Sequence, residues 1–176
     1  TAAFLLDGID CQVMTGLDRY ICWHIRVSSA HSPTEDESPE DILKFYDLIT
    51  AETHLPILVI SSVTALPYLK GILGDKSNVI FSKDIFDGFL NDAKLILGSC
   101  LYIQCGWGGA FTIPVASKIP YLGAPLERGL APWQMLKRHV RIDNMIRPWA
   151  STYQKTFSGY DDFEYKLKKL ATELAL

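Results

Sequence analysis

The sequence has few cysteines, and their spacing excludes the common cysteine-based sites. No pair forms a C-x-x-C motif, and none has the spacing of a zinc ligand set. The four residues are Cys11, Cys22, Cys100 and Cys105. We therefore expect no metal site. We also expect free buried thiols, as in a reducing compartment, which predicts a cytoplasmic location.

The chain also lacks a long apolar run and an excess of positive charge. Apolar residues make up 48% of its 176 residues. No apolar run approaches the ~20 residues of a membrane-spanning helix, and the N-terminal residues do not resemble a signal peptide. The formal net charge is −3, so no basic footprint indicates nucleic acid as a partner. The sequence predicts a globular protein without a transmembrane segment.

Several nucleotide-binding and catalytic motifs are missing as well. There is no Walker A motif and no G-x-S-x-G motif. The glycine-rich stretch GWGG, residues 106–109, follows a late strand and has the pattern G-x-G-G, so it does not fit the G-x-G-x-x-G dinucleotide-binding fingerprint. Its glycines can cradle a phosphate with backbone amides or simply allow close packing of a helix on a strand. The loop alone leaves both interpretations open.

Hydrophobic patterning predicts strands that alternate with helices. We expect buried or half-buried strands at residues 20–25, 55–61, 78–81, 101–104 and 119–122. Helices are expected between them, and Ser38-Pro39-Glu40-Asp41 is a strong helix start. Such alternation is typical of right-handed βαβ units and an open, mostly parallel Rossmann-like α/β sheet flanked by helices.

The remaining helices are less regular. We expect one that starts near Asp84 and buries a face containing Phe89 and Leu90. A short helix is expected at about residues 110–117, where the interior Pro114 favours a late start. We expect an N-terminal segment of uncertain role at residues 1–19, a Rossmann-like domain at 20–125 and a C-terminal helical extension at 126–176 that packs on the same domain.

Polar and basic residues follow the predicted strands and should meet at one edge. Because parallel strands end at the same edge of a sheet, ligands of such folds gather there. The residues expected at this edge are His24, Arg26, Ser28, Ser29, Ser61, Ser62, Ser82, Lys83, Gln104, Gly106, Gly108, Gly109, Gly123 and Ala124. This set suits an anion such as a phosphate or diphosphate. A packed histidine, a surface arginine and a solvated lysine remain the plainer alternative for His24, Arg26 and Lys83.

The order of these motifs resembles the C-terminal, donor-binding half of GT-B glycosyltransferases. W-H-I-R is similar to the His-x-Arg of their fucosyltransferase-like branch, and G-W-G-G-A-F-T-I-P-V-A-S-K-I-P is similar to their diphosphate-loop pattern. The resemblance covers roughly residues 20–125 and implies that this domain binds a nucleotide sugar. It implies that Arg26 grips the donor diphosphate with His24 beside it. It also implies donor contacts near the diphosphate loop from Gly106, Gly108, Gly109 and Thr112, and near the base or ribose from Ser82 and Lys83.

The resemblance implies a metal-independent glycosyltransferase that uses a nucleotide-diphosphate sugar as its donor substrate and needs no further cofactor. GT-B enzymes have two domains, so the acceptor domain and the catalytic base would lie upstream or on a partner chain. Pro114 to Ser117 contain no acidic residue, which favours an inverting mechanism or a different donor mode. Two alternatives stay open: a non-catalytic α/β binding or regulatory module of flavodoxin-like shape, and another α/β enzyme that processes nucleotides or sugar phosphates.

Overall fold

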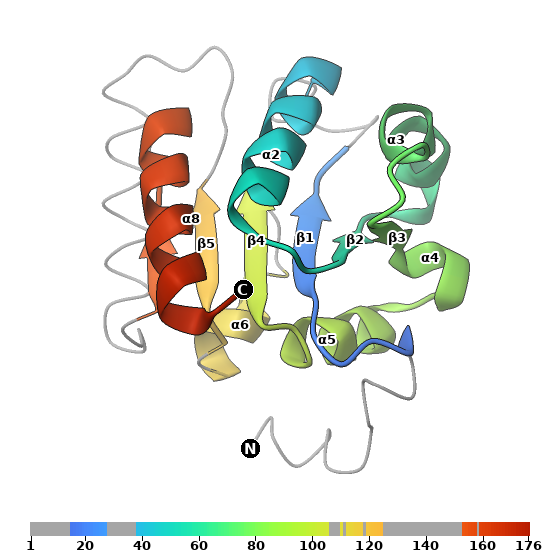
Figure 1. Ribbon diagram of the computed structural model, residues 1–176. Coiled ribbons are helices and arrows are strands. Elements are labelled where there is room, and N and C mark those ends of the chain that lie inside the picture. Colours follow the sequence, from blue (N-terminus) through green and yellow to red (C-terminus); the bar gives the residue numbers. More distant parts are fainter. Residues whose placement is uncertain are drawn as a thin grey trace, which may run out of the picture.

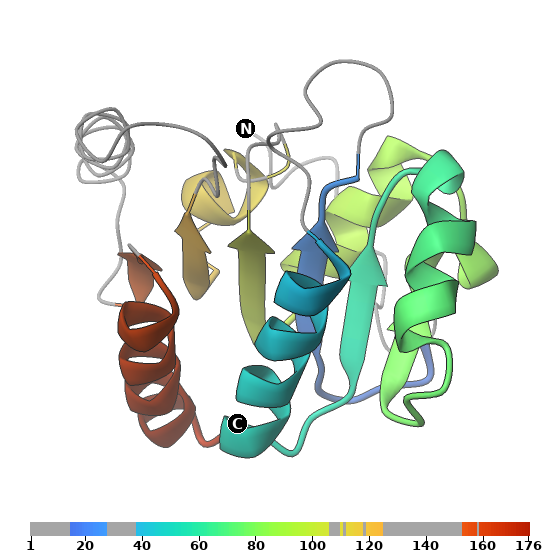
Figure 2. The same cartoon turned by 90° about the horizontal axis from the view of Figure 1, so that it is seen from above.

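The computed structural model describes residues 15–27, 38–105, 110, 112–117, 119–124, 153–157 and 159–176. These residues form a six-stranded sheet in the order β3-β2-β1-β4-β5-β6, and its five pairings are all parallel. Helices cover both of its faces (Figures 1 and 2). The α/β, Rossmann-like fold expected from the sequence is therefore confirmed.

The strand order reverses next to β1. The first half runs β1 (Ile21–Ile25), α2 (Pro39–Glu52), β2 (Ile57–Ile60), a 3-10 turn η3 (Val63–Ala65), α3 (Leu66–Leu73) and β3 (Val79–Phe81). The second half runs α4 (Ser82–Ile85), α5 (Phe89–Leu97), β4 (Leu101–Cys105), α6 (Thr112–Ser117), β5 (Tyr121–Ala124), β6 (Gln154–Thr156) and α8 (Tyr160–Leu174). The chain thus leaves β3 at one edge of the sheet and returns to the opposite side of β1, which places a switch point between β1 and β4.

Alternating side chains of β1 serve two separate cores. Ile21, Trp23 and Ile25 are buried beneath α2, α3 and α8, whereas Cys22 faces the core formed with α5. Because side chains alternate along a strand, His24 lies on the α5 face with Cys22. His24 therefore lies on the opposite face of the sheet from its neighbours Trp23 and Ile25.

Helix α2 begins as the sequence indicates. Ser38 is its N-cap, Pro39 is its first residue, and Ser38 and Asp41 form a reciprocal capping box. The side-chain oxygen of Ser38 accepts from the Asp41 amide at 3.2 Å. Ile42, Phe45 and Ile49 are buried, and the Phe45 ring lies 4.9 Å from that of Phe163 in α8. This aromatic contact joins α2 to the C-terminal helix on the same face of the sheet (Figure 1).

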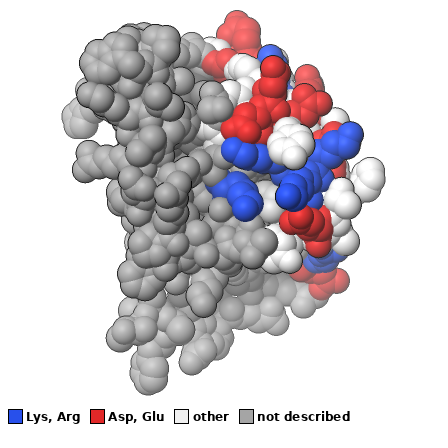
Figure 3. Space-filling view, turned by 90° about the vertical axis from the view of Figure 1, so that its left-hand side faces the viewer, with Lys and Arg blue, Asp and Glu red and all other residues white. Residues whose placement is uncertain are grey.

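The C-terminal region contributes a strand as well as a helix. Residues 154–156 pair with β5 as an edge strand, which the sequence did not indicate, and α8 then packs beside α2. Residues 126–152 of the expected C-terminal helical extension and residues 1–14 of the N-terminal segment lie outside the described residues. On the face that carries α8, basic and acidic side chains are intermixed (Figure 3), partly as Lys166–Asp162 and Lys169–Glu173 pairs one helical turn apart.

Pro114 is accommodated because α6 starts late. The helix begins at Thr112, so Pro114 is its third residue. The first four amides of a helix have no partner within the helix, so a proline there removes no hydrogen bond. The expectation of a short helix with a late start is confirmed.

Helices α4 and α5 correct one prediction. The sequence pattern indicated a single helix from Asp84 with Phe89 and Leu90 facing inward. Instead α4 ends at Ile85, and Gly88 adopts a φ of 97° before α5 begins. Phe89 and Leu90 are 65% and 67% exposed, so the prediction of their burial is wrong. The Asp87-Gly88 dipeptide, a common turn signal, is the sequence feature that marks this break.

Candidate functional site

Strand register brings the predicted site residues of the first three strands to one edge. His24 of β1 pairs with Ile60 of β2 and with Gln104 of β4, and Val59 of β2 pairs with Phe81 of β3. The segments that follow these strands therefore start at neighbouring points along the carboxyl edge of the sheet. This is where open α/β sheets bind their ligands.

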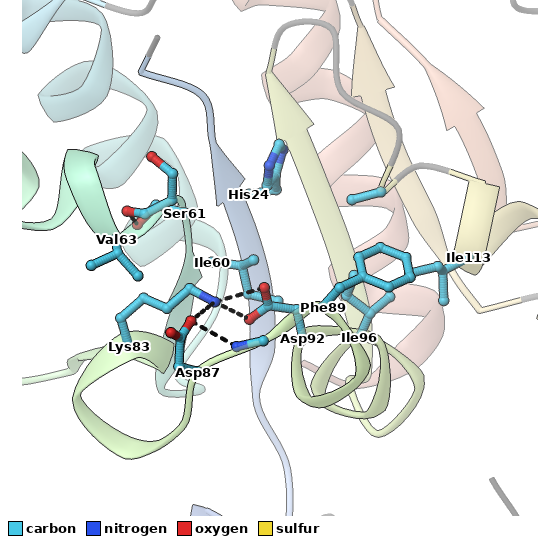
Figure 4. Close-up of a pocket in the computed structure, with 13 residues that line it drawn as sticks. His24, Ile60, Ser61, Val63, Lys83, Asp87, Phe89, Asp92, Ile96 and Ile113 are labelled. Carbon is cyan, nitrogen blue, oxygen red and sulfur yellow. Dashed lines mark hydrogen bonds and ion pairs between the residues drawn. The ribbon is translucent and has the colours of Figure 1, made fainter. Parts of the chain in front are cut away.

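A cavity of about 420 Å³ opens at this edge, on the α5 face of the sheet (Figure 4). We call it the carboxyl-edge cavity. One part of its lining is apolar and comes from Ile60, Val63, Phe89, Ile96, Ala110 and Ile113. The other part is polar and comes from His24, Ser61, Ser62, Lys83, Asp87 and Asp92. The size and mixed lining suit one ring system with a few directed polar contacts.

His24 lines the cavity as a neutral imidazole. Burial, and then the charge of nearby Arg26, lower its pKa from 6.5 to about 4. Its Nδ1 atom is buried and has no hydrogen-bond partner within the part of the chain that the structure describes. At neutral pH the ring adds no charge to the cavity, and it can offer a ligand hydrogen bonding without a net charge.

Lys83 is held by two carboxylates. Its ammonium Nζ lies 2.8 Å from Oδ2 of Asp92 and 3.6 Å from Oδ1 of Asp87 (Figure 4). The side chains of Lys83 and Asp92 are only 6% and 17% exposed, while that of Asp87 is 76% exposed. Lys83 therefore holds the N-terminal turn of α5 next to α4. Its ammonium group lines the cavity while it is paired with both carboxylates.

The three charged groups give the carboxyl-edge cavity an excess of negative charge. Lys83 carries one positive charge, Asp87 and Asp92 carry two negative ones, and His24 is neutral. Arg26 lies just beyond β1 and is close enough to His24 to lower its pKa. The described cavity itself is thus better suited to an uncharged group that donates hydrogen bonds, with the cationic Arg26 beside it.

The hydroxyl groups predicted for the site fall into two kinds. Ser61 and Ser62 follow β2 and line the cavity, and the Ser62 hydroxyl also caps the η3 turn by accepting from the Ala65 amide. Ser82, by contrast, is completely buried and its hydroxyl points to Asp92 Oδ1 at 3.5 Å. In this conformation Ser82 supports the ion-pair cluster and has no surface for a ligand.

The glycine-loop residues lie outside the part of the chain that the structure describes. Gly106, Gly108 and Gly109 are not among the described residues, and Thr112 is placed only as the first residue of α6, without its side chain. Sequence reasoning did not select Asp87, Phe89 and Asp92, which line the cavity, because it assigned them to one continuous helix. Within the described residues, no group of three or more His, Cys, Asp or Glu side chains is arranged to hold a metal ion.

Comparison with known proteins does not assign the chain to a family. No protein-family model matches the chain, and no curated protein is significantly similar to it. Among the described helices, none has both the length and the apolar character needed to cross a membrane.

Proposed function

We propose that this chain is the donor-binding domain of a GT-B glycosyltransferase, which binds a nucleotide-diphosphate sugar at the carboxyl edge of its sheet. The observation that carries the proposal is the carboxyl-edge cavity beside the strand-order reversal, with Arg26 next to it. Rossmann-like sheets bind nucleotides at this position. The His-x-Arg and glycine-loop motifs add the specific resemblance to sugar donors.

The charge distribution supports binding of the diphosphate at Arg26 and of the nucleoside in the carboxyl-edge cavity. An anionic diphosphate is disfavoured beside Asp87 and Asp92 but favoured at Arg26, whose guanidinium can bind two phosphate oxygens at once. The uncharged nucleoside then fits the cavity. Arg26 would stabilise the negative charge that develops on the departing diphosphate when an acceptor hydroxyl attacks the sugar, so the proposal requires no metal ion.

The acceptor site and the base that activates the acceptor are assigned to a second domain or a partner chain. Lys83 neutralises Asp92, and the low pKa of His24 makes it a weak proton acceptor. This same observation favours one alternative, a non-catalytic binding module that holds a nucleotide without turning it over. Hydrolysis or transfer of the sugar by the full protein would separate the two.

The proposal is tested by isothermal titration calorimetry with GDP, UDP and ADP, with NAD and FMN as comparison ligands. We expect at least one nucleoside diphosphate to bind and Arg26→Ala to weaken it about 10- to 100-fold, the effect of losing charge-assisted hydrogen bonds. Arg19→Ala is the matched control, since Arg19 precedes β1 and donates to the Leu174 carbonyl at 3.1 Å. Equal affinity for nucleotide in the wild type and Arg26→Ala would refute the assigned role.

A further inference from the structure

The break between α4 and α5 places the exposed side chains of Asp87 and Phe89 at the carboxyl-edge cavity. We call residues 86–88 the corner. Oδ1 of Asp87 accepts from the Gly88 amide at 2.7 Å, and the Asp87 carbonyl accepts from Asn91 Nδ2 at 2.7 Å. Gly88 has a φ of 97°, a conformation that other residues rarely adopt. The corner is thus a defined turn that presents Asp87 and the first residue of α5, Phe89.

Phe89 offers an unused aromatic face. It lines the cavity yet is 65% exposed, and Val63 on the neighbouring η3 turn is 53% exposed and lines the same cavity. Exposed apolar side chains that gather at a cavity are typical of ligand contacts. A planar ring can stack on Phe89, and such contacts contribute to binding of any base because every base has a π-face. The apolar lining therefore favours a flat heterocycle.

Asp87 offers an unused acceptor edge. Its Oδ1 bonds the Gly88 amide, whereas its Oδ2 makes no hydrogen bond within the described residues. Lys83 stays close to Asp92 at 2.8 Å and reaches Asp87 only at 3.6 Å, so the Asp87 carboxylate keeps acceptor capacity. An ionised carboxylate accepts two parallel N–H bonds from one partner. The group that matches it is a ring edge with two adjacent N–H donors.

We propose that Asp87 and Phe89 determine which base the domain accepts: Phe89 stacks on the ring, and Asp87 binds the paired ring N–H and amino group of guanine. This inference rests on the proposed nucleotide-binding function. Uracil, cytosine and adenine lack such a pair of adjacent donors on a single edge, and hypoxanthine lacks the amino group. The proposal names a base for the ligand and two residues that recognise it.

The test compares the dissociation constants of GDP and IDP, which differ only by the amino group of the base, together with those of UDP and ADP. We expect the wild type to bind GDP at least about 10-fold more tightly than IDP, as for the loss of one charge-assisted hydrogen bond. Asp87→Asn should bring the GDP-to-IDP ratio close to one, and it should weaken GDP more than IDP because IDP offers only the ring N–H to this side chain. Asp75→Asn, at an aspartate that is likewise exposed but lies in the turn before β3, should preserve the ratio.

Phe89 is tested with its neighbour as the control. Phe89→Ala should weaken GDP and IDP alike by about 10-fold, the effect of losing one stacking contact. Leu90→Ala removes a side chain of equal exposure that does not line the cavity, and should leave both affinities unchanged. Preference for UDP or ADP, or a GDP-to-IDP ratio that survives Asp87→Asn, would overturn the inference while leaving the proposed function intact. Failure of every nucleotide to bind would overturn both.

Discussion

The buried ion pair between Lys83 and Asp92 yields the sharpest stability prediction. Lys83→Met keeps most of the side-chain volume but removes the charge that Asp92 faces at 2.8 Å. Removing one partner of a buried pair typically costs 3–5 kcal/mol because the other charge stays buried and uncompensated. Asp92 is 17% exposed and so keeps some contact with water. We therefore expect a loss of about 2–4 kcal/mol in the free energy of unfolding.

The control is a second lysine–aspartate pair on the same part of the chain. Lys70 lies 2.6 Å from Asp84, but both side chains are 45% exposed. Exposed pairs contribute about 0–1 kcal/mol, so Lys70→Met should have a small effect despite the shorter distance. The comparison separates burial from proximity as the source of the stabilisation.

The assay is urea unfolding at pH 7, followed by far-UV circular dichroism. An unchanged slope against urea in Lys83→Met would show that the midpoint reports stability alone. The double variant Lys83→Met/Asp92→Leu should recover most of the loss, because no uncompensated charge remains. The reasoning is refuted if Lys83→Met costs no more than Lys70→Met, or if the double variant is less stable than the single one.

Two further predictions concern His24 and the start of α2. The folded-state pKa of His24, about 4, lies below its ordinary 6.5, so the unfolded chain takes up the proton first as the pH falls. The free energy of unfolding of the wild type relative to that of His24→Gln should therefore fall between pH 7 and pH 4, by at most about 3 kcal/mol. The same pH dependence of the free energy of unfolding in both proteins would contradict this. Ser38→Ala should cost about 1 kcal/mol in thermal unfolding by removing the capping box with Asp41, whereas an unchanged Tm would show that the cap contributes nothing.

The fold was largely predictable because its signals are local. The continuous apolar run at residues 55–61 predicts a strand buried on both faces, and Ser38-Pro39 marks the start of α2. Strand β6 escaped prediction because Gln154–Thr156 carries no apolar pattern and is held as an edge strand through backbone pairing with β5. The corner was missed because Phe86, Phe89 and Leu90 continue a helical spacing through a glycine that breaks the helix.

The candidate site was predictable in its position and less so in its contacts. Parallel strands guarantee that residues after β1, β2 and β3 share an edge, so the grouping of His24 with Ser61 and Lys83 follows from the strand order. The pairing of Lys83 with Asp92 does not, because it depends on how α5 is turned against α4. No local pattern encodes that orientation, which is set by tertiary packing.

The most direct test of the central claim is to locate the nucleotide on the protein by NMR. In ¹H–¹⁵N spectra of the labelled chain titrated with GDP, we expect chemical-shift changes that centre on the backbone amides of Ser61, Ser62, Gly88 and Phe89, which line the carboxyl-edge cavity. The amides of α8, on the opposite face of the sheet, should stay unchanged. Changes confined to α8, or no change at a saturating concentration of GDP, UDP or ADP, would contradict the account.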